Sequence, residues 1–170
     1  PNGRLIAASA QSVPGRLRVW DVATRTLTPY RSATQSASIA FSRRGDRLAT
    51  ATGAGPAEVR DVRTGRLVAK LAADGDSRSV AFSPDGKHVL VIGYTSAEAF
   101  QPLGLDWWFV DVDSGDAVPT GASALLAREG MGAVTGRTLS SPASLSPPVC
   151  WSAASNTVVL SAAVGETDDL

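Results

Sequence analysis

Short apolar runs separated by compact polar segments recur along the chain. One such stretch reads SVAFSPDGKHVLVIG, residues 79–93, and its apolar ends flank the polar segment Ser-Pro-Asp-Gly at 83–86. Proline presets its backbone dihedral, aspartate bonds its own backbone, and glycine accepts a left-handed conformation, so this segment predicts a tight turn. The flanking runs are rich in Val, Leu, Ile and Phe, and several are nearly continuous. Such runs are typical of β-strands in sheets that are covered on both faces.

The hairpin pattern occurs more than once. The other copies are SIAFSRRGDRLATAT at 38–52, the weaker VCWSAASNTVVLSAA at 149–163, and a second half, PNGRLIAAS, at 1–9. A different unit lies between the copies: LRVWDVATRTLT at 17–28, AEVRDVRTGRLV at 57–68, and WWFVDVDSGDAV at 107–118. Its Asp-Val pairs start at Asp21, Asp61 and Asp111, which are 40 and 50 residues apart. A period near 40 residues that holds four short strands is typical of a propeller blade.

These repeats resemble the WD-repeat β-propeller family. Val19-Trp20-Asp21-Val22 contains the dipeptide that names the family, and residues 83–86 match its usual turn between the first two strands of a blade. The resemblance covers the chain except for residues 120–147, and it implies an all-β fold of four-stranded antiparallel blades. The buried His-Ser-Trp-Asp tetrad of many family blades is absent, since the only histidine, His88, falls inside a hairpin. The related YVTN-type and TolB-type propellers therefore remain open as branches.

The strand pattern predicts a single domain over residues 1–170, a partial β-propeller of about three and a half blades. The expected blade segments are 1–31, 36–71, 77–119 and 148–163, with insertions at 94–106 and 119–147. Closed propellers carry about four to eight blades, and an open arc exposes apolar blade faces at both ends. We therefore expect the chain to be part of a larger ring, completed by further blades or by self-association.

Composition and charge exclude several classes of partner. The 170 residues include 16 basic and 16 acidic side chains, so no electrostatic footprint for nucleic acid is present. No apolar stretch approaches the ~20 residues needed to cross a bilayer. Cys150 is the only cysteine, which excludes an internal disulfide and a thiolate metal cage. We expect no metal and no cofactor, and we expect the protein in the cytoplasm, although the chain opens at Pro1 with neither an initiator Met nor a signal-peptide pattern.

Few residues could carry catalysis. Asp21, Asp61 and Asp111 stand at the same place in their repeats, just before a turn, and repeat-equivalent residues usually serve the repeat, here by accepting hydrogen bonds from turn amides. His88 starts a strand and is expected at the surface or half-buried. No Gly-rich phosphate loop, zinc spacing or calcium loop is present. We therefore expect no catalytic residue and no enzyme activity.

The two insertions define a candidate partner surface. We letter the strands of a blade a to d; because they alternate in direction, the b–c loops and d–a connections emerge on one face, and the a–b and c–d turns on the other. Both insertions project from the first face, and long loops in compact repeats are often functional. Residues 123–132 within the second insertion fit either a short helix or a mobile linker. The candidate partner-binding residues are Tyr94, Phe100, Trp108, Leu125, Leu126 and Arg128.

Trp108 is the sharpest anomaly among these candidates. It aligns with Arg18 and Glu58, which are charged residues of the sister blades. It is expected either to bind a partner or to pack beneath the neighbouring insertion. Its neighbours Trp107 and Phe109 are expected in the core.

The resemblance implies a non-catalytic scaffold or sensor that binds a protein partner, as one module of a larger bacterial signalling or regulatory protein. The partner is expected on the face that bears the b–c and d–a loops. The alternative is part of a propeller hydrolase or lactonase, or of a peptidase-gating propeller, whose catalytic residues lie outside this chain. Such enzymes place converging His, Asp, Glu or Asn at loop ends around the central channel, and no His falls there in this sequence.

Overall fold

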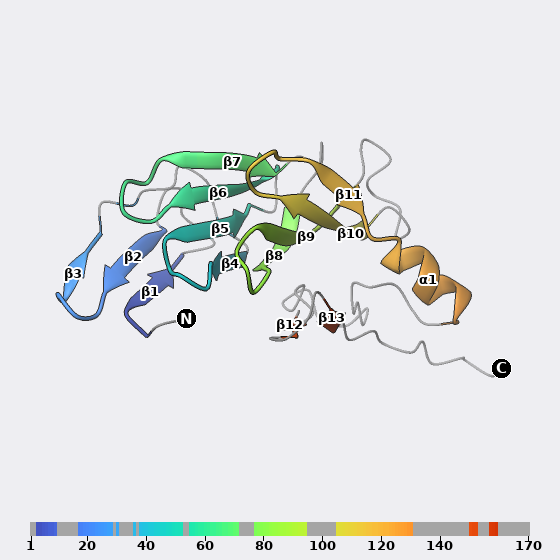
Figure 1. Cartoon of the computed structure of the whole chain (residues 1–170), viewed down its shortest axis with the longest axis horizontal. Helices are drawn as coiled ribbons and strands as arrows, with labels where there is room; N and C mark the ends of the chain where they lie inside the picture. The colour runs from blue at the N-terminus through green and yellow to red at the C-terminus, as the bar shows by residue number, and fades with distance from the viewer. Residues whose placement is uncertain are drawn as a thin grey trace.

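The computed structural model describes residues 3–9, 17–28, 30, 36, 38–52, 55–71, 77–94, 105–130, 150–152 and 157–159. These residues form antiparallel β-sheets and a single short helix, which confirms the predicted all-β class (Figure 1). Phe100, Met131 and most of both insertions lie outside the described residues. The helix has seven residues, and no helix of the described part is long and apolar enough to cross a membrane.

The strands form four sheets, each made of strands that are consecutive in the chain. The first contains β1 (Leu5–Ala8), β2 (Arg18–Asp21) and β3 (Thr26–Leu27); the second contains β4 (Ser38–Phe41), β5 (Arg47–Ala51), β6 (Ala57–Asp61) and β7 (Leu67–Leu71). The third contains β8 (Ser77–Phe82), β9 (His88–Tyr94), β10 (Leu105–Asp111) and β11 (Ala117–Pro119); the fourth contains β12 (Cys150–Trp151) and β13 (Val158–Val159). Helix α1 (Ala122–Arg128) follows the third sheet.

The predicted turn at residues 83–86 is confirmed, and side chains hold its shape. The Ser83 hydroxyl accepts a hydrogen bond from the His88 amide at 3.0 Å and donates one to the Asp85 carboxylate at 2.6 Å. Gly86 has a φ of 72°, a left-handed conformation that glycine adopts without steric cost. In residues 42–47 of the second sheet, Ser42 accepts from the Arg47 amide in the same way, but its hydroxyl donates to Asp46, four residues on.

In each of the first three sheets, the recurring Asp-Val pair connects the turn that follows it with the turn before the preceding strand. As predicted, the aspartate side chains accept hydrogen bonds from the turn that follows: Asp21 from the Ala23 and Thr24 amides, Asp61 from the Thr64 amide and hydroxyl, and Asp111 from the Asp113 and Ser114 amides. The valine amides donate to the residue just before β1, β5 and β9: Val22 to the Arg4 carbonyl at 2.8 Å, Val62 to that of Asp46 at 2.9 Å, and Val112 to that of Lys87 at 2.9 Å. The dipeptide therefore recurs because each of the first three sheets uses it to close the same end.

Hydrophobic cores lie between successive sheets. The first core contains Leu17, Val19, Tyr30, Leu48 and Val62; the second contains Ala49, Ala51, Ala57, Val59, Leu71, Val80, Phe82, Val89, Val91, Val110 and Val112; the third contains Leu90, Ile92 and Trp107. Strand β9 shows how these cores are built, because Val89 and Val91 enter the second core whereas Leu90 and Ile92 enter the third. The nearly continuous apolar run thus lies in a sheet covered on both faces, as predicted.

Leu48 provides a direct measure of this packing. Its side chain is fully buried in the first core, so we expect Leu48→Ala to lower the free energy of unfolding by about 2–5 kcal/mol through lost burial and the cavity left behind. Urea unfolding followed by circular dichroism measures the change. The matched control is Leu125→Ala on α1, where the leucine is 51% exposed and the loss should stay below about 0.5 kcal/mol. Equal losses in the two variants would contradict the stacked arrangement.

Candidate functional site

Two of the predicted partner-binding residues contribute to packing. Trp108 is half-buried and packs against the second core, between the second and third sheets. Leu126 packs against the third core. Tyr94 ends β9, but its side chain, like Phe100, lies outside the described part of the chain.

Helix α1 carries the predicted residues that do reach the surface. Leu125 is 51% exposed, and the exposed Arg128 forms an ion pair with the adjacent Glu129 at 3.2 Å. The Asp106 carboxylate at the start of β10 holds the N-terminal end of the helix by accepting hydrogen bonds from the Gly121 and Ser123 amides. The helix is therefore docked on the third sheet with Leu125 and Arg128 facing outward.

Trp107 and Phe109 follow their predicted roles to different degrees. Trp107 is fully buried in the third core. Phe109 is only partly buried and stacks on His88, with ring centroids 4.4 Å apart, while Trp151 of β12 lies 5.9 Å away. The half-buried position of His88 agrees with expectation.

The first sheet exposes an apolar row whose residues were not singled out from the sequence, although apolar faces are expected at the ends of an open arc. Ile6 of β1 lies opposite Trp20 of β2, and Trp20 lies opposite Leu27 of β3, so the three side chains share one face across all three strands. They are 57%, 41% and 54% exposed. We call Ile6, Trp20 and Leu27 the apolar row.

The equivalent positions of the other sheets are covered. The cross-strand sets that correspond to the apolar row are Leu48, Arg60 and Leu67 in the second sheet, and Val89, Val110 and Ala117 in the third. Leu48, Val89 and Val110 are fully buried, each against the sheet that precedes its own in the chain. The apolar row thus corresponds to surfaces that a neighbouring sheet covers in the second and third sheets. No sheet formed by the described residues lies on it.

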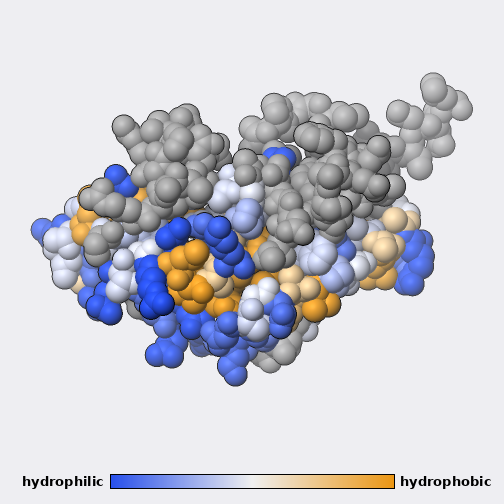
Figure 2. Space-filling view, turned by 90° about the horizontal axis from the view of Figure 1, so that it is seen from above, coloured by the Kyte–Doolittle hydropathy of each residue, from blue (hydrophilic) through white to orange (hydrophobic). Residues whose placement is uncertain are grey.

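Other exposed hydrophobic residues lie on the outermost strands. Val68 of β7 and Val118 of β11 belong to the strands along the top of Figure 1. Figure 2 looks down on that side and shows hydrophobic residues reaching the surface between hydrophilic ones. Single exposed apolar residues are ordinary on protein surfaces, whereas a contiguous row is not.

A charged pair and a tyrosine lie beside the first core. Arg60 and Glu58 form an ion pair at 2.8 Å, with side chains only 20% and 12% exposed. Burial raises the pKa of Tyr30 to about 12; the charge of Arg60 opposes this shift and that of Glu58 adds to it. Tyr30 is therefore protonated at neutral pH and serves the packing rather than proton transfer.

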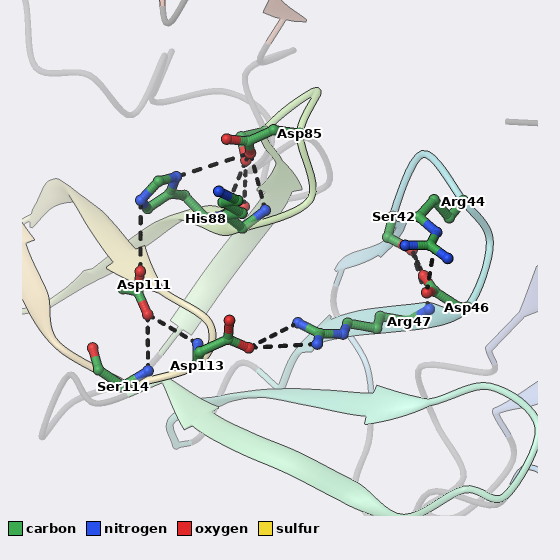
Figure 3. A network of polar contacts seen from close by, with 11 residues as sticks. Ser42, Arg44, Asp46, Arg47, Asp85, His88, Asp111, Asp113 and Ser114 are labelled. Atoms are coloured by element: carbon green, nitrogen blue, oxygen red, sulfur yellow. Dashed lines mark hydrogen bonds and ion pairs between the residues drawn. The ribbon is translucent and has the colours of Figure 1, made fainter.

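We call the end of the sheets that holds the Asp-Val pairs the turn end. At this end, the turns of the second and third sheets carry a polar network (Figure 3). The His88 Nε2 atom lies 3.7 Å from an Asp111 oxygen, and its Nδ1 atom lies 3.9 Å from an Asp85 oxygen. Arg47 reaches from the second sheet to Asp113 of the third, at 3.4 Å. Among the described residues, no group of three or more His, Cys, Asp or Glu side chains could hold a metal ion.

Hydrogen bonds in the turns lower the pKa of four aspartates below their ordinary value of 3.8. The largest cause is the Arg4 side chain for Asp21, the Thr64 hydroxyl for Asp61, the Ser83 hydroxyl for Asp85, and the Ser114 amide for Asp111. These carboxylates therefore act as charged acceptors that hold the turns.

Comparison with known proteins defines only the fold. No protein-family model matches the sequence, and no curated protein matches it. In contrast, 542 chains of solved structures match it in fold. One of them is hydrazine synthase from Kuenenia stuttgartiensis, with a TM-score of 0.57 and 18% identity over 70% of the present chain. The chain spans 32% of that chain, and at this identity the similarity carries no information on activity.

The lowered aspartate pKa values predict acid-sensitive stability. A carboxylate with a depressed folded-state pKa stabilises the fold above its unfolded pKa near 3.8, and this contribution is lost as the pH falls through the lower folded value. We expect Asp61→Asn to keep an oxygen acceptor for Thr64 but to remove one titrating group, so its unfolding free energy should depend less steeply on pH. Urea unfolding between about pH 3 and 6 tests this. Identical slopes in the variant and the wild type would contradict the assigned role of Asp61.

Proposed function

We propose that this chain is part of a β-propeller that serves as a non-catalytic scaffold for a protein partner. The apolar row carries the proposal, since its counterparts in the second and third sheets are buried under a neighbouring sheet. A contiguous apolar sheet face in water is unfavourable and marks an association surface. A further sheet of the ring, or another chain, would cover it.

Sheet order and turn geometry support the propeller. The second and third sheets each contain four antiparallel strands in chain order, and the first three sheets repeat the Asp-Val closure at one end. The period near 40 residues and the resemblance to WD repeats point the same way. The fourth sheet, with its two strands, would be the beginning of a further blade.

The partner face of this scaffold is the one from which α1 projects. Leu125 and Arg128 are exposed there, while Trp108 and Leu126 pack against the cores below them. A helix that is docked on the third sheet and presents one apolar and one cationic side chain suits protein recognition better than chemistry. We propose the chain as one module of a larger bacterial signalling or regulatory protein, located in the cytoplasm.

Trp20→Arg tests the association surface. Arginine already stands at the equivalent position of the second sheet, Arg60, so the strand should tolerate it. We expect light scattering coupled to size exclusion to show a wild-type mass that rises with concentration, and a Trp20→Arg variant that stays monomeric with an unchanged unfolding midpoint.

Val68→Arg is the matched control, because Val68 is also 41% exposed but stands outside the apolar row. It should associate like the wild type. A wild type that stays monomeric at every concentration would contradict an association surface on the first sheet.

A further inference from the structure

Positive and negative side chains are distributed unevenly over the turn end of the stacked sheets. The turns of the first two sheets cover residues 3–4, 21–25, 42–47 and 61–66, and those of the third cover 83–88 and 111–116. The turns of the first two sheets hold seven arginines and three aspartates, whereas the turns of the third sheet hold one lysine and four aspartates. The ion pair of Arg47 and Asp113 bridges the boundary (Figure 3). This end is therefore positive over the first two sheets and negative over the third.

A cavity of about 510 Å³ opens in the positive half, between the first and second sheets. Leu5 and Val62 supply apolar lining, and Arg4, Arg44 and Arg63 bring three guanidinium groups from three different turns. Its volume lies within the ~300–1,000 Å³ typical of ligand sites. Asp21, Asp46 and Asp61 line the cavity as well, so its lining is apolar in part and holds three arginines and three aspartates.

The carboxylates of the cavity are already engaged, and Asp21 in turn holds Arg4, so the cationic capacity of this half comes from Arg63, the exposed Arg44 and the other arginines of the same turns. Asp21 accepts hydrogen bonds from Arg4 and turn amides, and Asp61 accepts them from Thr64. Asp46 accepts the Ser42 hydroxyl, and its other oxygen lies 3.7 Å from Arg44, whose side chain is 86% exposed. Arg63 is exposed, and its charge contributes to the lowered pKa of Asp61.

We propose that this cavity binds an extended acidic peptide segment of a protein partner. Guanidinium groups pair with carboxylates through two parallel hydrogen bonds, and the excess of seven arginines over three aspartates on the turns of the first two sheets suits several carboxylates along one chain better than one small anion. The aspartates of the third sheet repel a longer polyanion and limit the bound segment to the first two sheets. The site lies at the turn end of the sheets, away from α1, so it does not depend on the proposed partner face. It shares Leu27 with the apolar row, so binding is measured at a concentration at which the chain is monomeric.

Fluorescence anisotropy with a labelled peptide of about ten glutamates tests the site on the full chain. We expect binding that weakens as salt is added, because the arginines are exposed. Arg63→Glu should weaken it about fivefold or more. Lys87→Glu changes the net charge equally at an exposed turn in the negative half, and should alter the affinity less than about twofold. Unchanged circular dichroism of both variants separates binding from folding.

Three results would overturn the proposal. The first is the absence of binding, or equal losses in Arg63→Glu and Lys87→Glu. The second is displacement of the peptide by an equal concentration of inorganic phosphate, which would indicate a site for a small anion. The third is tighter binding of duplex DNA than of the peptide, which would indicate a nucleic-acid surface. None of these outcomes bears on the association through Trp20.

Discussion

Each inner sheet of this chain must be covered on both faces, because apolar residues occupy consecutive positions of its strands. Consecutive residues of a strand point to opposite faces of the sheet, so the run from Val89 to Ile92 makes both faces apolar. Burying a side chain of this size contributes about 1.5–3 kcal/mol, and the sheets therefore stack. The three cores and the order of the sheets follow from this requirement.

Stacking also decides where polar chemistry can lie. With the sheet faces occupied, charged groups concentrate where strands end. There the aspartates serve the turns first, and their lowered pKa values record hydrogen bonds that close hairpins. Arg4 and Arg47 share in this structural task, since Arg4 holds Asp21 and Arg47 bridges to Asp113. The arginines of the first two sheets still outnumber the aspartates there, which is why the positive half of the turn end is the better candidate for recognition.

The two proposed association surfaces differ in physical character. The apolar row resembles the interior of the stack and suits a partner that is itself a sheet. The cavity near Arg63 is polar, exposed and sensitive to salt, and it suits a flexible acidic segment. A scaffold that uses both could combine permanent assembly through one surface with reversible binding through the other.

The sequence by itself determined the features that are local or that repeat. The hairpin turn at 83–86 and the capping role of Asp61 and its equivalents follow from residue chemistry over a few positions, and the burial of Trp107 follows from alignment with its sister repeats. The packing of Trp108, the exposure of Trp20 and the charged cavity were decided only by the tertiary structure. Whether a strand residue is buried depends on whether another sheet lies on its face, and the charge of a surface depends on which turns meet there. Neither property is encoded in the neighbouring residues of the chain.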